Sequence, residues 1–186
     1  MFSKQAFSAF LLLLTSATLW SCKKDSEPTP TPAAPASMEC KVNNVSWKAA
    51  TFNNTLITST TAVPPGKRLD IRGTAADGTT IILTVSEPTT TAPGSIKPDT
   101  YHMNVFLNLP PNYQSGTPVK GALGTYIGAL AQKLYVTNLE SEGQIVITAC
   151  DAAKKTVSGT FSFVATDFNE GTLGVTAGTF TNLSYR

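Results

Sequence analysis

The sequence predicts an all-β protein: a single antiparallel β-sandwich of about ten strands over residues 38–186, after a signal peptide and a Pro/Thr-rich tether. Apolar and polar residues alternate with period two in many short segments, as expected for half-buried strands. No segment of ten or more residues has the 3.6-residue period of an amphipathic helix. Threonine, which favours strands, occurs 28 times in 186 residues.

Residues 1–21 have the pattern of a signal peptide. A positive charge at Lys4 precedes an apolar stretch around residues 10–14, and the segment becomes small and polar before Cys22. Even counted generously, the apolar stretch is shorter than the roughly 20 residues of a membrane-spanning helix. We therefore expect this leader to be an export signal.

The end of the leader, Leu19-Trp20-Ser21-Cys22, resembles the lipobox of bacterial lipoproteins. The resemblance implies cleavage before Cys22, a thioether-linked diacylglycerol and an amide-linked acyl chain such as palmitate. Several acyl chains anchor a protein stably, whereas one alone holds only marginally. The expected partner is thus a membrane, with localisation at the outer membrane on either its surface or its periplasmic face. The alternative is ordinary secretory cleavage that leaves Cys22 as an incidental thiol.

Residues 22–37 are expected to hold the domain away from the membrane. Charges at 23–27 are followed by a segment dominated by proline, threonine and alanine, which favours an extended polyproline-like tether over a packed core. Such a tether reaches roughly 30 Å. The 149 residues from Met38 to Arg186 are enough for one domain with a single core.

Turn dipeptides separate the first predicted strands. Asn43-Asn44 precedes a segment in which Val45, Trp47 and Ala49 alternate with polar residues, so Trp47 is expected to anchor the core, with ligand stacking as the alternative. Asp77-Gly78 lies between the alternating segments 69–74 and 81–85 and predicts a hairpin, because both residue types accept the backbone conformations of a tight turn.

The later strands follow the same alternation. Tyr101, Met103 and Val105 share one face of a predicted strand. Ile145 and Ile147 are expected to pair with Phe161 and Phe163 across a polar connection at residues 151–155. The last segment, 173–185, changes phase on both sides of Phe180, so Ala177-Gly178 is expected to form a bulge or break.

The C-terminal segments resemble a family of secreted bacterial lipoproteins whose domain has no assigned function. The resemblance rests on a strand at 145–148 ending near Asp151, the Ser-Gly-Thr-Phe strand at 157–163 and a closing Gly-x-Phe strand at 178–183. It implies an antiparallel sandwich at the cell envelope and no catalytic residue. The chain departs from the family at Cys150, where a bulky or aromatic residue is more usual.

Charge and residue counts argue against several kinds of partner. The formal net charge is only +2, which argues against nucleic acid. His102 is the only histidine, and two cysteines remain after Cys22 is lipidated, so no zinc site of His and Cys ligands is expected. We therefore expect no metal and no cofactor.

Cys40 and Cys150 are candidates for a disulfide, since two remaining thiols in an oxidising envelope suggest a bridge. The alternative is two separate buried thiols. Neither has the sequence surroundings of a catalytic cysteine, and no Gly-x-Ser-x-Gly motif is present. The segment Asp167–Gly171 resembles the start of a calcium loop but lacks the later ligands, so a hairpin turn is expected.

The longest strand-poor stretch, Asn108–Gly121, contains Tyr113 between Asn112 and Gln114. Loops of this length often bind ligands, so Tyr113 is a candidate ligand contact; the alternative is a covering loop with the ring packed on the domain. The sequence therefore predicts a non-catalytic envelope module that binds a glycan or an envelope protein, or serves adhesion or support. The rival prediction is a hydrolase with paired carboxylates.

Overall fold

The computed structural model describes residues 34–59, 66–88, 95–103, 120–129, 133–138 and 141–186. The chain divides into two compact units, Met1–Pro32 and Ala33–Arg186, and every described residue belongs to the second. No helix among the described residues is long and apolar enough to cross a membrane.

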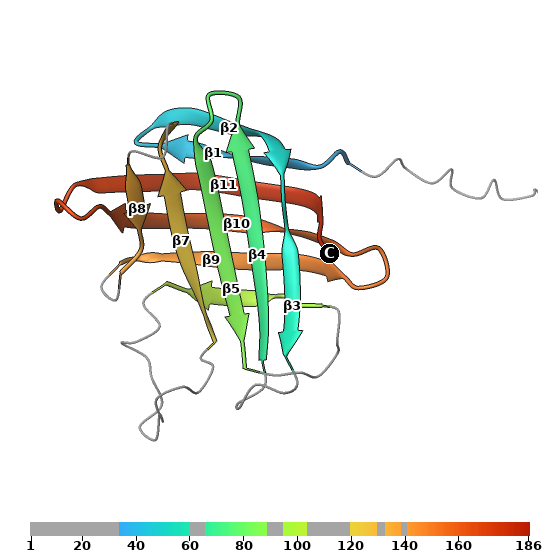
Figure 1. Ribbon diagram of the computed structural model, residues 1–186. Coiled ribbons are helices and arrows are strands. Elements are labelled where there is room, and N and C mark those ends of the chain that lie inside the picture. The colour runs from blue at the N-terminus through green and yellow to red at the C-terminus, as the bar shows by residue number, and fades with distance from the viewer. Residues whose placement is uncertain (1–33, 60–65, 89–94, 104–119, 130–132, 139–140) are drawn as a thin grey trace, which may run out of the picture. The chain divides into compact units, whose positions relative to one another are not determined.

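The described residues form eleven strands, all paired antiparallel (Figure 1). Their bounds are β1 Ser37–Val42, β2 Val45–Phe52, β3 Thr55–Ser59, β4 Gly66–Ala75, β5 Thr80–Glu87, β6 Asp99–His102, β7 Gly121–Ile127, β8 Leu134–Val136, β9 Gly143–Asp151, β10 Thr156–Thr166 and β11 Thr172–Ser184. The prediction of an all-β antiparallel fold is confirmed.

The local predictions for the first two hairpins are also confirmed. Asn43 and Asn44 both have positive φ, of 47° and 66°, and join β1 to β2, which fits the tight turns that hairpin twist favours. The β4–β5 hairpin turns at Asp77-Gly78, with Gly78 at a φ of 86°. Its strands are in register from Lys67 opposite Glu87 to Thr74 opposite Thr80.

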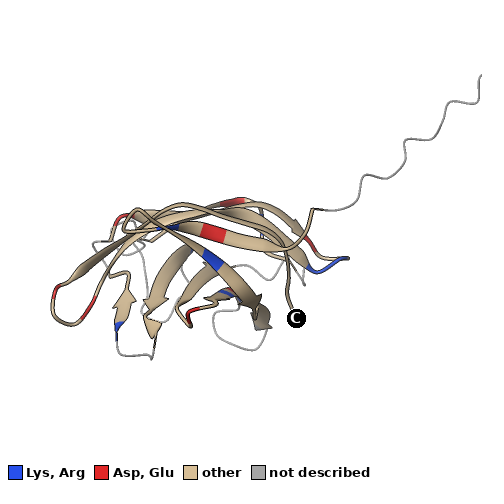
Figure 2. Ribbon diagram, turned by 90° about the horizontal axis from the view of Figure 1, so that it is seen from above, with Lys and Arg blue, Asp and Glu red and all other residues tan. Residues whose placement is uncertain are grey.

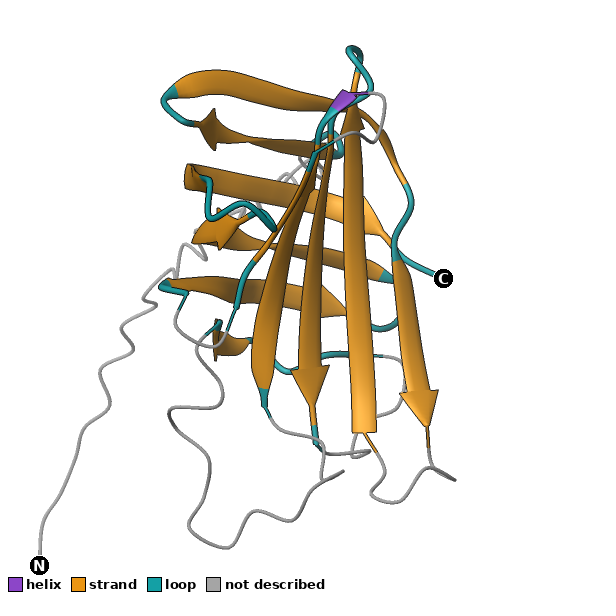
Figure 3. Ribbon diagram, turned by 60° about the vertical axis from the view of Figure 1, so that its left-hand side comes forward, coloured by secondary structure: helices purple, strands orange, loops and turns teal. Residues whose placement is uncertain are grey.

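The prediction of a sandwich was wrong, because the strands close into an eight-stranded barrel in the order β11-β1-β2-β4-β5-β7-β8-β10. The ring closes where Val136 of β8 bridges Thr166 of β10 and β10 pairs with β11. In Figures 1 and 3, β4, β5 and β7 run across the direction of β9, β10 and β11, as two crossed layers do.

β2 explains why the two layers do not end in open edges. Its first half, Val45–Lys48, pairs with β1, and its second half, Ala49–Phe52, pairs with β4. The register is irregular between Ala49 and Thr51, so the strand bends there from one layer into the other. The alternation in the sequence identifies the buried face of each strand but does not show which strand edges are joined.

Three strands lie outside the ring: β9 and β6 extend it beside β10, and β3 pairs with β4. β9 pairs with β10 as expected, with Ile145 opposite Phe161, Ile147 opposite Gly159 and Phe163 opposite Gly143. β11 is one continuous strand with two phase changes, marked by positive φ at Ala177 and Asn182. These bulges let Val175, Phe180 and Leu183 all point into the core.

The barrel interior is filled by side chains. A Cβ on Gly124 of β7 would lie 2.8 Å from the Phe163 ring of β10, and a Cβ on Gly73 of β4 would lie 2.7 Å from the Met38 sulfur of β1. At these two glycines the strands on either side of β2, and those on either side of β8, pack directly against each other. The interior is a packed core of the kind that eight strands can fill.

Different side chains cover the two ends of the barrel. At the β4–β5 turn, the Trp47 indole N–H donates to the Thr79 hydroxyl at 2.8 Å, and that hydroxyl donates to Asp77 at 2.7 Å. The bond from Thr79 also lowers the pKa of Asp77. At the other end Ile96, only 1% exposed, closes the core. Trp47 is thus a core anchor, as expected.

Replacing Gly124 by alanine should destabilise the barrel by about 1–3 kcal/mol, because the new methyl group overlaps the Phe163 ring. Urea unfolding followed by tryptophan fluorescence measures the change. Gly174→Ala on β11 is the matched control, since its Cβ would meet nothing closer than 3.9 Å. Equal stability of the two variants would contradict the close approach of β7 and β10.

Candidate functional site

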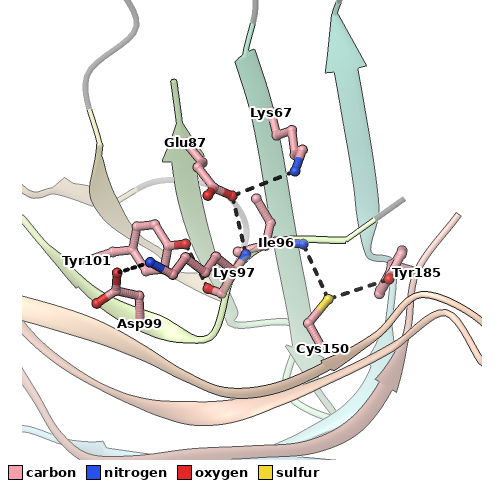
Figure 4. Close-up of polar contacts among 8 residues, drawn as sticks. All are labelled: Lys67, Glu87, Ile96, Lys97, Asp99, Tyr101, Cys150 and Tyr185. Carbon is pink, nitrogen blue, oxygen red and sulfur yellow. Dashed lines mark hydrogen bonds and ion pairs between the residues drawn. The ribbon is translucent and has the colours of Figure 1, made fainter. Parts of the chain in front are cut away.

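The ionisable groups that lie closest together surround the Ile96 end of the barrel (Figure 4). Lys67 and Glu87 are directly opposite on β4 and β5, with Nζ and Oε2 4.0 Å apart and both side chains no more than 8% exposed. The same Glu87 oxygen accepts the backbone N–H of Lys97 at 3.2 Å. This carboxylate therefore binds the segment before β6 to the end of β5.

Tyr101 is part of the same cluster. Its hydroxyl donates to the carbonyl of Lys97 at 2.8 Å, and burial, followed by the charges of Glu87 and Asp99, raises its pKa. Lys120 donates to Asp99 at 2.7 Å and lies 5.2 Å from the centre of the Tyr101 ring. The Lys120 bond is the main cause of the lowered pKa of Asp99.

Cys150 and Tyr185 complete the cluster. The Cys150 sulfur lies 3.4 Å from the N–H of Ile96 and 3.5 Å from the Tyr185 hydroxyl. Burial is the main cause of the raised pKa of Tyr185, and its contact with Cys150 adds to it. Each of these groups bonds to another part of the fold, and neither Glu87 nor Asp99 lines a cavity described below. The cluster closes the barrel end.

A second arrangement of polar groups lies on the outward face of β6, β9, β10 and β11. His102 of β6 is opposite Gln144 of β9, and Gln144 is opposite Ser162 of β10. Thr176 continues this row on β11, beside the bulge. Together with Glu142 they line an open cavity of about 420 Å³. Strand register therefore places four polar side chains side by side.

A second cavity, of about 400 Å³, adjoins the first and shares Glu142 and Val164 with it. Its other lining residues are Asn138, Ser141 and Thr166. We call the two cavities together the outer groove. The Ser141 hydroxyl accepts the backbone N–H of Asn138 at 2.7 Å and contacts its side-chain oxygen at 3.1 Å. This part of the groove is therefore fixed by local hydrogen bonds before any ligand arrives.

The outer groove offers neutral hydrogen-bonding chemistry. Its polar lining consists of amide, hydroxyl and imidazole groups and one described carboxylate, Glu142. None of the described lining residues is Lys or Arg. Figure 2 shows the charged residues dispersed over the strands, without a concentration of one sign. The groove suits an uncharged ligand rich in hydroxyl groups more than a phosphate or a polyanion.

A third cavity, of about 390 Å³, lies against β1 and β2 and includes Cys40, Trp47 and Ala177. Burial raises the pKa of the Cys40 thiol to about 12, so almost none of it is the reactive thiolate at neutral pH. The Trp47 N–H is already bonded to Thr79. Glu39, Lys41 and Lys48 also line this cavity, so its lining is charged where that of the outer groove is mostly neutral.

The described residues contain no group of three or more His, Cys, Asp or Glu side chains placed to hold a metal ion. The Asp167–Gly171 segment is a hairpin turn, as expected. The Asp167 carboxylate accepts the N–H groups of Asn169 at 2.9 Å and Gly171 at 2.7 Å, so it serves the turn.

The structure separates the two domain cysteines, and both are free thiols. Cys40 lies on β1 and Cys150 on β9, with β11 and β10 between these strands. Three strand spacings amount to roughly 14 Å across the sheet, about twice the Cα separation that a disulfide tolerates. The candidate bridge is therefore not formed. Cys22 and Tyr113 lie outside the described residues.

Sequence reasoning did not identify the outer groove. Gln144, Ser162 and Thr176 are polar residues at outward strand positions, where such residues are ordinary. Their only signal is the alternation that turns them away from the core. Which of them become neighbours depends on the register of four strands, and the bulges of β11 shift that register.

The family model described as "Domain of unknown function (DUF6252)" matches residues 34–184. Neither the curated proteins nor the solved structures contain a match to this chain. The match agrees with the expected resemblance to a family without an assigned function.

Alkylation without reductant should modify both domain cysteines. In the Cys22→Ser variant, we expect two alkyl groups per molecule after denaturation, measured by intact mass. In the folded chain Cys150 should react first, since it is half-buried, whereas burial keeps Cys40 protonated. A denatured chain that takes up alkyl groups only after reduction would establish the bridge and contradict the structure.

Proposed function

Because the chain belongs to the DUF6252 family, which has no assigned activity, we propose its function from its own geometry: it is a lipid-anchored outer-membrane protein whose barrel binds a neutral glycan, without catalysis, in the outer groove. The anchor is the lipid on Cys22, and the tether between Cys22 and the start of β1 at Ser37 carries the domain.

The composition of the outer groove carries this proposal. Sugar hydroxyls both donate and accept hydrogen bonds, and so do the Gln144 amide and the Ser162 and Thr176 hydroxyls of the groove. The volumes of the two cavities lie within the usual range for ligand sites, about 300–1,000 Å³. A neutral ligand in such a groove should bind with little dependence on salt.

The filled interior supports a ligand site on the outside. Small barrels that carry ligands keep a central cavity, but here Phe163 packs on Gly124 and Met38 on Gly73. Trp47 and Thr79 cover one end, and Ile96 closes the other. A ligand inside the barrel would have to displace core side chains, whereas the outer groove is already open.

The single carboxylate in the described lining supports a role without catalysis. A glycosidase pair needs two carboxyl groups about 5–10 Å apart across the scissile bond. Glu142 is the one acid among the described groove residues, and Glu140 lies outside them. No observation favours the rival hydrolase. Its signature would be cleavage of a bound glycan, which sugar analysis after long incubation detects.

Gln144→Ala should weaken glycan binding about 2- to 12-fold, the loss expected when one hydrogen bond worth about 0.5–1.5 kcal/mol is removed. The measurement is isothermal titration of the mature chain with the best binder from a panel of neutral oligosaccharides.

The matched control is Thr148→Ala. Thr148 is exposed on the same strand but does not line the groove, so its replacement should leave affinity unchanged. Equal affinities of wild type and Gln144→Ala would show that Gln144 does not contact the glycan. Wild-type protein that binds no member of the panel would refute the function.

Cys22→Ala should move the protein from the membrane fraction to the soluble fraction, since it removes the site of the acyl chains that anchor the chain. Immunoblotting of fractionated cells measures the distribution. Ser21→Ala, which keeps a small residue before the cysteine, is the control and should stay in the membrane fraction. Unchanged partitioning of Cys22→Ala would contradict the lipid anchor.

A further inference from the structure

Phe168 is the most exposed large apolar side chain among the described residues, at 91% exposure. Burying a phenylalanine stabilises a protein by about 1.5–3 kcal/mol, so this side chain contributes almost nothing to the fold. It lies in the turn between β10 and β11, where a polar residue would serve a hairpin equally well. Packing and turn formation therefore do not explain why a phenylalanine is at this position.

Hydrogen bonds fix the conformation of the turn that carries Phe168. Asp167 holds it through four hydrogen bonds: its carboxylate accepts two backbone N–H groups, its own N–H donates to the carbonyl of Gly171 at 2.9 Å, and its carbonyl accepts the N–H of Glu170 at 3.2 Å. Glu170 has a positive φ of 63°, which these bonds stabilise. A ring displayed on a fixed turn loses little conformational entropy on binding, which favours affinity.

Phe168 also follows closely after the last residue of β10 that lines the outer groove. Ser162 and Val164 line the first cavity, Val164 and Thr166 line the second, and all three are alternate residues of β10. Phe168 follows Thr166 by two residues. Ser162 and Thr166 are roughly 13 Å apart at about 3.3 Å per residue. The groove is therefore elongated along β10 as far as Thr166, two residues before the exposed Phe168.

We propose that the outer groove holds an extended oligosaccharide along β10 and that Phe168 stacks on the sugar ring at the end of that chain. This inference rests on the glycan-binding function proposed above. Pyranose rings have an apolar C–H face beside their hydroxyl groups, so they suit an aromatic ring at the end of a row of amide and hydroxyl groups.

Titration of the mature protein with oligosaccharides of different length tests both the extended ligand and the stacking role of Phe168. The ligands are neutral β-linked and α-linked glucose, xylose and N-acetylglucosamine oligomers, each from monosaccharide to hexasaccharide. For the series that binds, affinity should rise with length and then level off. Phe168→Ala should weaken hexasaccharide binding about tenfold while leaving monosaccharide binding within twofold, and Phe168→Trp should retain wild-type affinity.

Val45→Ala is the matched control, because Val45 is also exposed, at 70%, but lies on the β1–β2 hairpin. Val45→Ala should bind oligosaccharides of every length with wild-type affinity. Thermal unfolding should show that Phe168→Ala and Val45→Ala are both folded. Equal hexasaccharide affinity of Phe168→Ala and wild type would overturn the stacking role, and equal affinity for monosaccharide and hexasaccharide would overturn the extended ligand. In both cases the wild type still binds sugar, so the proposed function stands; no binding by the wild type would refute both.

Discussion

The close approach of β7 and β10 is the constraint on which the rest of the structure depends. Gly124 leaves the space that the Phe163 ring fills, and a single methyl group there would overlap the ring. This contact joins the two layers near the point where β8, only three residues long, bridges β10 at one residue pair. Core packing across the barrel, more than the β8 ladder, therefore holds the ring closed.

A filled ring moves ligand recognition to the outside. Eight strands enclose a space that side chains can occupy completely, and here they do so, with Trp47 and Ile96 covering the ends. β9 and β6 then extend the layer beside β10 and widen its outward face. The first cavity of the outer groove has a wall on this extension, at His102 and Gln144, so the strands outside the ring provide part of the surface that the ring itself lacks.

The buried Lys67–Glu87 pair shows that burial of charged groups does not by itself identify a functional site. Two charges removed from water cost several kcal/mol unless each is compensated. Glu87 has two partners, the Lys67 ammonium and the Lys97 N–H, and the second binds the segment that carries Ile96. The pair is explained by closure of the barrel end, while the less conspicuous neutral groove has the open volume and donor set of a binding site.

The sequence by itself determined the strands, their buried faces and several turns, because these depend on neighbouring residues: Asn43-Asn44, Asp77-Gly78 and the phase changes around Phe180 all act locally. It also determined the prediction of an exported, lipid-anchored chain, which rests on a linear motif at Cys22. Only the tertiary structure decided that β2 passes from one layer to the other, that Cys40 and Cys150 lie strands apart, and that Gln144, Ser162 and Thr176 share a groove. These features depend on which strand edges pair and in what register, and residues distant in sequence settle both through core packing.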